Sequence, residues 1–415
     1  MELNARGHTG GRAVLLVLLA ASTLGVMGGA VIVPVLELIR GDLGVSGTLG
    51  GFILTAHGLA IAVSSPMFGR AIDRWGVRRP MIGGLVVYAL GGGAGLVATS
   101  YPVLIVSRLV FGVGAAAVFT GTTVAMLAFY RGAERDRVMG WRSTATSVGG
   151  LVWPLLGGVL GGLTWHATFA VYLVGLPLAL LAVWSLPDTP KRPQDAQAAG
   201  VAGMLRRRPT LLGWYGLWIV IAVQMYVLAI FLPQRLAQIG IRAPVLVSLY
   251  AVVGAAITTS LVGLVYSRLR ARLSYAALLR TALTTSLAGF LIYATVTQPV
   301  VLLLAPALFG IGNGILFPVA TVLVDQAAGA EYRSRAASLS GTAIFAGQFL
   351  SPLLFGPLIE ATSTTTGFLV AGAVSAILLA VVLARRIGAE AEIDATADHA
   401  GLQQEAEVGG SRDTT

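Results

Sequence analysis

Three ionisable side chains interrupt the long apolar runs of this sequence, and each could take part in proton transfer. His57 lies nine residues into the run 48–68, roughly 13 Å from its start at 1.5 Å per helical residue. Imidazole titrates near neutral pH, which suits a proton relay. Arg108 lies inside the run 102–129, where a charge costs about 3 kcal/mol or more unless it faces a cavity or a partner. Glu37 lies near the end of the first run, within a helical turn of the depth of Arg108, so an ion pair between them could exchange its proton for a substrate.

Each of these residues also has a purely structural interpretation. His57 could be a neutral imidazole that hydrogen-bonds between helices. Arg108 could extend its side chain to the nearer membrane surface, and Glu37 could be an interfacial residue at a helix end. The sequence leaves these alternatives open, and it predicts proton coupling by Arg108 together with Glu37 or His57.

A short charged segment from Gly69 to Arg79 could form a gate. Its glycines permit a tight, reversed turn, and Asp73 stands among four arginines. A carboxylate in such surroundings can hold two packed elements together through a charge cluster, although it can also be a solvated residue in a basic loop. The predicted gating residues are Gly69, Asp73, Arg74, Gly76, Arg78 and Arg79.

The segment from Gly140 to Gly162 is apolar enough to cross a bilayer, yet it contains seven glycines and a proline. Glycine costs a helix roughly 1 kcal/mol relative to alanine, but it lets two backbones pack almost in contact. Proline adds a bend. The segment therefore predicts a kinked helix at an interface, with these key residues: Gly140, Gly149, Pro154, Gly157 and Gly158.

Enzymatic chemistry and cofactors find no support in the sequence. It contains no nucleotide-binding loop of the G-x-x-x-x-G-K type, no cysteine for thiolate metal sites, and four scattered histidines. We therefore predict that the protein is not an enzyme, needs no cofactor or metal, and takes its energy from an ion gradient.

Composition and hydropathy predict an all-α integral membrane protein. The 415 residues are 56% hydrophobic and 11% charged, whereas a soluble domain has about 25% charged residues. The net charge of +10 lies in short clusters between apolar runs, which favours membrane loops over nucleic-acid binding. Each of twelve runs is near or above the roughly 20 residues that a span needs. They are 13–39, 48–68, 80–99, 102–129, 138–163, 167–186, 211–232, 243–267, 275–296, 299–324, 336–359 and 367–384.

The basic residues predict the orientation. With both termini in the cytoplasm, 24 of the 28 Lys and Arg residues fall on the inner side, three fall outside and Arg108 is within a span. This asymmetry is typical of cytoplasmic loops, and it predicts a multi-pass protein of the cytoplasmic membrane.

Prolines and glycines recur at a spacing near 198 residues, which indicates two homologous halves. Pro154 is matched by Pro352 and Gly112 by Gly310, both 198 residues later. The predicted parts are a cytoplasmic N-terminus (1–12), a six-helix bundle (13–186), a flexible cytoplasmic linker (187–210), a second six-helix bundle (211–385) and a disordered tail (386–415).

Three motifs resemble those of the major facilitator superfamily, in its drug:proton antiporter branch. Gly69–Arg79 is similar to the loop between the second and third helices, Arg108–Gly114 to the fourth-helix motif, and Gly140–Gly158 to the fifth-helix antiporter motif. The resemblance implies two pseudo-symmetric six-helix bundles that rock about a central substrate site. It also implies that Asp73 joins a latch and that Arg108 assists proton transfer or binds anionic groups. Two positions depart from the family: Trp153 replaces a usual glycine, and Phe111 a frequent glutamine.

In such a fold, spans 1, 4, 7 and 10 line the substrate cavity. Aromatic, methionine and amide side chains there suit a lipophilic ligand. The predicted lining residues are Phe119, Gln224, Met225, Tyr226, Asn313 and Phe317.

The resemblance therefore predicts a monomeric exporter that binds a small-molecule substrate and protons within the lipid bilayer and has no nucleic-acid partner. Three alternatives stay open. The protein could import a small metabolite, although the fifth-helix motif speaks against this. It could export one endogenous metabolite, or it could be a non-transporting sensor or lipid-flipping protein of the same fold.

Overall fold

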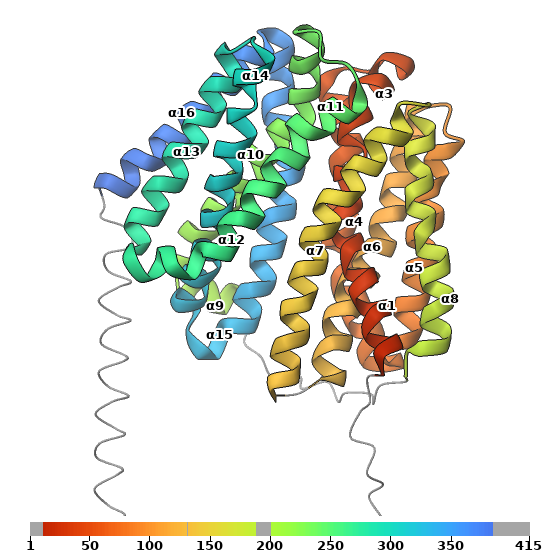
Figure 1. Cartoon of the computed structure of the whole chain (residues 1–415). Coiled ribbons are helices and arrows are strands. Elements are labelled where there is room, and N and C mark those ends of the chain that lie inside the picture. Colours follow the sequence, from red (N-terminus) through yellow and green to blue (C-terminus); the bar gives the residue numbers. More distant parts are fainter. Residues whose placement is uncertain (1–10, 131, 188–200, 385–415) are drawn as a thin grey trace, which may run out of the picture.

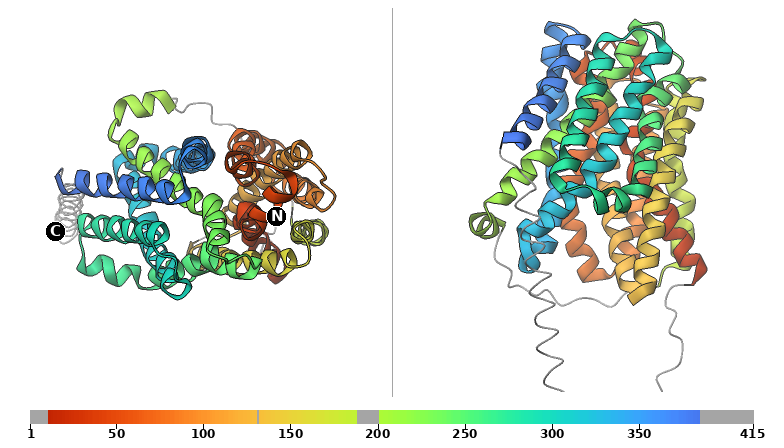
Figure 2. Two further views of the ribbon diagram at one scale, coloured as in Figure 1. Left: turned by 90° about the horizontal axis from the view of Figure 1, so that it is seen from above. Right: turned by 60° about the vertical axis from the view of Figure 1, so that its left-hand side comes forward.

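The computed structural model describes residues 11–130, 132–187 and 201–384, and within them every regular element is a helix. The helices form two bundles, one from α1 to α8 and one from α9 to α16 (Figure 1). Seen from above, the two bundles lie side by side (Figure 2). The predicted all-α membrane architecture of two six-helix halves is confirmed.

The first bundle begins with a broken helix. The first span is divided by two 3₁₀ turns, and Pro34 lies in the second. A glycine with a φ of 62°, Gly44, ends it, and Ser46 caps α4 by accepting the Leu49 N–H. The elements are α1 (Arg12–Thr23), η1 (Leu24–Val26), α2 (Met27–Ala30), η2 (Val33–Val35), α3 (Leu36–Leu43), α4 (Gly47–Trp75), α5 (Arg78–Gly93), η3 (Ala94–Leu96), α6 (Tyr101–Phe129), α7 (Gly132–Gly161), η4 (His166–Val174) and α8 (Gly175–Ser185).

The second bundle contains one element that holds two spans. Gly329, with a φ of 69°, turns the chain inside α15, so this element contains two candidate membrane spans. The elements are α9 (Val201–Arg207), α10 (Thr210–Gln238), α11 (Pro244–Ser248), η5 (Leu249–Val253, a π-helical turn), α12 (Gly254–Arg272), α13 (Tyr275–Thr295), α14 (Pro299–Leu302), α15 (Leu304–Ala361) and α16 (Thr364–Ala384).

Eleven helical segments of the described chain are long and apolar enough to cross a membrane. The one predicted span missing from these eleven is the third, 80–99, which corresponds to α5; this helix has only 16 residues and is extended by η3. Its first turn contains Arg78 and Arg79, and these charges lower its hydropathy. The C-terminal ends of α4, α6, α8 and α12 lie at one end of the molecule (Figure 1), which we call the basic end. The other end, with the loops around Gly44, Gly240 and Ser363, we call the opposite end.

Glycine contacts show that the two halves repeat the same packing. A Cβ on Gly112 of α6 would collide with the backbone of His57 in α4, and a Cβ on Gly310 of α15 would collide with the backbone of Ala255 in α12. Each half therefore packs its fourth span on its second through a bare backbone. The 198-residue spacing preserves this contact.

The two halves meet at the opposite end. A Cβ on Gly356 would collide with the Thr48 side chain, and a Cβ on Gly158 would lie 3.0 Å from the Pro244 carbonyl oxygen. These two glycines are again 198 residues apart, so one pseudo-symmetric pair of contacts closes this end. The helices diverge toward the basic end (Figure 1).

Parts of the predicted organisation lie outside the described residues. These are residues 1–10, most of the tail and residues 188–200 of the predicted linker. The remainder of that linker contains the helix α9, whose Met204 is fully buried in the second bundle. The helix lies at the edge of the molecule near the basic end (Figure 2).

Candidate transport site

A cavity of about 570 Å³ lies between the two halves. The first half contributes the broken first span and α4 to α7, and the second contributes α10, η5, α12, α13 and α15. Aliphatic residues and glycines make up most of its walls, and eight aromatic rings join them. The rings that line it are Tyr88, Phe111, Phe119, Tyr226, Tyr293, Phe309, Phe317 and Phe345, together with His57.

No Asp, Glu, Lys or Arg is found among the described residues that line this cavity. Two of its tyrosines already use their hydroxyls within the protein. Tyr88 donates to the Leu24 carbonyl at 3.1 Å, and Tyr293 donates to the Tyr250 carbonyl at 3.1 Å. The cavity can therefore hold an apolar molecule, whereas a fully charged one would find no counter-charge on its walls.

Five of the six predicted cavity residues line this space: Phe119, Met225, Tyr226, Asn313 and Phe317. The prediction for Gln224 is wrong. Its amide is buried and donates to Ser375 Oγ at 2.8 Å and to the Ala371 carbonyl at 3.2 Å. Gln224 therefore points toward α16 and stabilises packing inside the second bundle.

His57 lines the cavity at the contact between α4 and the broken first span. It is 4% exposed, and its ring meets the Phe111 ring edge-on at 5.6 Å. Its Nδ1 is buried and forms no hydrogen bond of normal geometry. Its Nε2 lies so close to Gly28 that any side chain at position 28 would collide with it. Gly28 thus leaves the room in which the imidazole sits.

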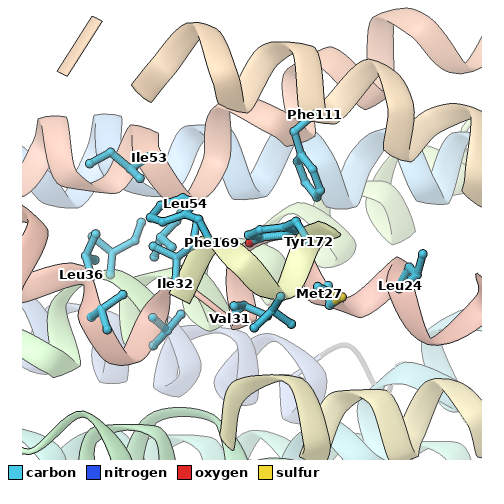
Figure 3. Packing of buried hydrophobic residues seen from close by; sticks show 14 of the residues in the cluster. Leu24, Met27, Val31, Ile32, Leu36, Ile53, Leu54, Phe111, Phe169 and Tyr172 are labelled. Carbon is cyan, nitrogen blue, oxygen red and sulfur yellow. The ribbon is translucent and has the colours of Figure 1, made fainter. Parts of the chain in front are cut away.

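Arg108 does not line the cavity, because it is completely buried behind Phe111. The guanidinium carbon lies 5.0 Å from the ring centres of Phe111, Phe169 and Tyr172. Phe111 points from α6 toward Tyr172 (Figure 3). Phe111, which replaces a frequent glutamine, thus provides a cation–π contact instead of a hydrogen bond.

The same guanidinium also caps the C-terminal end of α5. Its Nη2 donates to the Gly92 carbonyl at 2.8 Å and to the Gly91 carbonyl at 3.2 Å. These carbonyls belong to the last turn of α5, where backbone acceptors lack partners within the helix and a positive charge is favourable. The alternative in which Arg108 extends to the membrane surface is excluded by its burial.

The predicted ion pair between Glu37 and Arg108 is not formed. Glu37 instead pairs with Arg40, one helical turn later, at 2.7 Å. This contact is local because both residues lie on α3, beyond the break at Pro34. Glu37 lines a second, smaller cavity of about 260 Å³ at the opposite end, together with Pro34, Pro233 and Arg242.

The predicted gating residues lie where α4 turns into α5. Gly76 has a φ of 77°, a conformation that glycine adopts easily, and it ends α4 directly after Trp75. The motif predicts such a turn. Arg78 donates to the Val183 carbonyl of α8, and the Arg74 guanidinium lies 5.9 Å from the Trp75 ring. Asp73 is half-buried and has no ion pair within 4 Å among the described residues. A Cβ on Gly69 would meet nothing within 4 Å, and Arg79 is exposed.

The predicted interface helix corresponds to α7, with Pro154 inside it. Its glycines serve different contacts. Gly149 and Gly157 press on the Thr23 and Val31 backbone within the first half, and Gly158 faces the second half. Gly140 meets nothing within 4 Å. Trp153, the departure from the family pattern, donates its indole N–H to the Thr23 carbonyl at 3.1 Å.

Two features of this site escaped the sequence analysis. Gln348 lines the cavity from α15 with its Oε1 buried and without a hydrogen-bond partner. Glu360 bonds across the two halves to Thr48 at the opposite end. Gln348 lies in the eleventh predicted span, and Glu360 directly follows its predicted end.

Two helical bundles that span a membrane and enclose a cavity between them define a class of protein, the multi-pass membrane transporter. The family model for the Major Facilitator Superfamily matches residues 18–279 and 237–406, so this chain belongs to the Major Facilitator Superfamily. The predicted family is thereby confirmed, and the chain is a transporter rather than an enzyme.

Individual relatives are distant. Multidrug resistance protein 1 of Bacillus subtilis (strain 168) is 22% identical over 356 residues, which cover 83% of this chain and 90% of that protein. The solved nucleoside transporter NupG has a TM-score of 0.76 at 14% identity and covers 89% of this chain and 99% of its own. A bacterial homologue of the human lysosomal transporter Spinster, in an inward-facing and unoccupied conformation, has a TM-score of 0.71 at 16% identity and covers 89% and 94%. These structures share the fold with this chain.

Proposed function

We propose that this protein exports uncharged or weakly charged lipophilic molecules across the cytoplasmic membrane, in exchange for protons, by alternating access. The observation that carries the proposal is the aromatic cavity between the halves, whose described walls have no fixed charge. The similarity to a multidrug resistance protein over most of both chains supports the same substrate class. One chain contains both walls of the cavity, so a monomer suffices.

In this proposal the basic end faces the cytoplasm, with both termini, as the distribution of Arg and Lys favours. The opposite end then faces outward and is closed by the contacts of Gly158 and Gly356. A closed outer end gives a state that takes up its substrate from the cytoplasm. Export follows when the halves rock, which closes the basic end and opens the opposite one.

The segment from Gly69 to Arg79 is the inner gate in this scheme. In the present state Asp73 has no ion pair with a described residue, and Gly69 has free space around it. A latch that has not yet closed should have these two properties. The Asp73 carboxylate can then form an ion pair with the other half, and the Gly69 backbone can pack against it. Arg74, Gly76, Arg78 and Arg79 shape the turn that presents Asp73.

His57 is the proposed proton carrier. It is the one described cavity residue whose side chain ordinarily titrates near neutral pH. Arg108 stands behind the same Phe111 ring that His57 contacts, so its fixed positive charge acts on the imidazole through the cavity wall. Glu37 has a different position, in the second cavity at the opposite end, and there it can receive protons from outside.

The test uses cells that lack their own major efflux pumps and are loaded with N-phenyl-1-naphthylamine, a neutral fluorescent molecule. Cells that produce the protein should lose the dye faster than cells with an empty vector, and a protonophore should abolish the difference. Equal rates in both strains would overturn export. Persistent efflux after the proton gradient has collapsed would overturn proton coupling, and increased dye uptake would favour the importer.

A further inference from the structure

We propose that Arg142 binds the anionic group of a lipophilic organic acid at the edge of the cavity, on the side of the basic end. This inference rests on the proposed function, since it names the substrate class of the same cavity. The apolar body of such a molecule lies among the rings of the cavity, and its carboxylate or sulfonate lies beside Arg142. A molecule of the same shape with a positive group is disfavoured there.

Arg142 continues the face of α7 that lines the cavity. Thr146 and Gly150, one and two helical turns further along, both line it, and residues four positions apart share a helix face. The Thr146 hydroxyl donates to the Arg142 carbonyl at 2.9 Å. Arg142 itself is not among the lining residues. It therefore lies at the edge of the cavity, one turn toward the basic end, where the halves diverge (Figure 1).

One ring of the cavity connects this edge to the interior. The Arg142 guanidinium carbon lies 5.7 Å from the ring centre of Phe119 in α6. Phe119 lines the cavity and is 50% exposed, so its ring is open to a ligand. The cation–π contact keeps the guanidinium at this ring. An apolar molecule that packs on Phe119 therefore brings its polar end within reach of Arg142.

The Arg142 guanidinium is accessible for binding. It forms no hydrogen bond and no ion pair with another described residue, and none of its nitrogens belongs to the buried atoms that lack a partner. Its N–H groups are therefore open, and their planar fork matches the two oxygens of a carboxylate. Arg108 is the opposite case, because its unpartnered Nη1 is buried and cannot be reached by a ligand.

Two rings of the cavity wall have a cation beside them, and no described carboxylate neutralises either cation. Arg108 lies behind Phe111, and Arg142 lies beside Phe119. No Asp or Glu is found among the described residues that line the cavity. The one ion pair within 4 Å among the described residues is at the opposite end. In surroundings of low polarity, two such positive charges favour an anion and disfavour a cation.

The experiment compares two probes with one skeleton, by fluorescence, on purified protein in a neutral detergent. N-phenyl-1-naphthylamine is uncharged, and 8-anilinonaphthalene-1-sulfonate has the same rings with a single added sulfonate. Arg142→Gln should weaken binding of the sulfonate about tenfold, the effect of one charge-assisted hydrogen bond. Binding of the uncharged probe should not change, which also reports that the cavity is intact.

Two further variants are matched controls. Arg142→Lys keeps the positive charge but not the planar fork, so it should weaken sulfonate binding by no more than about threefold. Arg206→Gln removes an exposed arginine of α9, a helix that does not line the cavity. Both probes should bind to this variant as they bind to the wild type.

A second pair of ligands tests the sign of the charge. Tetraphenylborate and tetraphenylphosphonium have the same shape and opposite charge, and each should displace the uncharged probe. Arg142→Gln should weaken displacement by the borate and strengthen displacement by the phosphonium. No change in either, an equal weakening of both naphthalene probes in Arg142→Gln, or an equal loss of sulfonate binding in Arg206→Gln would overturn the site. None of these results affects the proposed export, because efflux of the uncharged dye tests it separately.

Discussion

One carboxylate oxygen of Glu360 accepts two hydrogen bonds from Thr48, from its backbone N–H at 2.8 Å and from its hydroxyl at 2.9 Å. Glu360 ends the eleventh span and Thr48 begins α4, so the contact joins the two halves at the opposite end. Thr48 lies in the first turn of α4, where backbone N–H groups lack helical partners and favour a negative charge. Glu360 is therefore a cap for a helix of the other bundle.

Loss of this cap should shift the protein toward the state that is open at the opposite end. Glu360→Ala removes an acceptor worth about 1–2 kcal/mol, which changes the ratio of the two states roughly five- to thirtyfold. The chain has no native cysteine, so Ile230→Cys, at the buried seam beside Gly51, is a single reporter. A membrane-impermeant maleimide added from the opposite side should label it faster in the Glu360→Ala background.

Thr362→Ala is the control for that measurement. The Thr362 hydroxyl donates to the Leu358 carbonyl within its own helix and has no bond across the halves, so labelling should stay at the wild-type rate. If Glu360→Ala also leaves the rate unchanged, the cap does not hold the opposite end closed.

Arg108→Ala should lower stability as well as abolish transport. The guanidinium satisfies two carbonyls at the end of α5, and their loss should cost about 2–3 kcal/mol. The check is the melting temperature in detergent, measured beside dye efflux at equal amounts of inserted protein. Arg108→Lys keeps the charge but cannot reproduce the planar donor set, so it should recover little of either property. Full transport by Arg108→Ala would remove this residue from the mechanism.

Neighbouring glycines of α7 should respond very differently to substitution. A Cβ on Gly157 would collide with the Val31 carbonyl, whereas a Cβ on Gly150 would meet nothing within 4 Å. Gly157→Ala should therefore destabilise the first half by about 1–3 kcal/mol, while Gly150→Ala should be neutral or slightly stabilising. The thermal midpoints of the two variants check this. Equal midpoints would mean that α7 and the first span do not rely on backbone contact at Gly157.

Gly140→Leu should bind dye but not transport it. The space around Gly140 is free in the present state, so the variant should fold and keep its cavity. If α7 meets the second half when the basic end closes, a leucine at this position prevents that closure. Dye binding to purified protein should match the wild type while efflux falls at least tenfold. Normal efflux would place Gly140 away from the closing surface.

Much of the fold could be predicted from the sequence, because the bilayer imposes it. The lengths of the apolar runs predicted the twelve spans, although α5 is shorter than its predicted span. The spacing of Gly112 and Gly310 predicted the two halves. The motif residues are also positioned by local rules, as the positive φ of Gly76 illustrates. Five cavity residues could be predicted because they lie in spans 4, 7 and 10, which line the cavity in this fold.

Side-chain partners could not be predicted in the same way, since depth along a helix does not fix direction around it. Glu37 and Arg108 lie at similar depth, but Glu37 is beyond the break at Pro34 and pairs with Arg40. Gln224 and Met225 are adjacent, yet one faces α16 and the other the cavity. Gln348 and Glu360 matter through contacts with residues about 290 to 310 positions away in sequence, which no local pattern reports.

The central claim is that the two halves alternate about the seam between α4 and α15. Spin labels in the cysteine-free chain test it directly, with one pair at the opposite end (Gly41→Cys and Ser363→Cys) and one at the basic end (Ser143→Cys and Ala271→Cys). Distances should be recorded without ligand and with N-phenyl-1-naphthylamine at two pH values. We predict that conditions which lengthen the opposite-end distance shorten the basic-end distance in the same sample. Distances that do not change under any condition, or that lengthen together at both ends, would contradict alternating access.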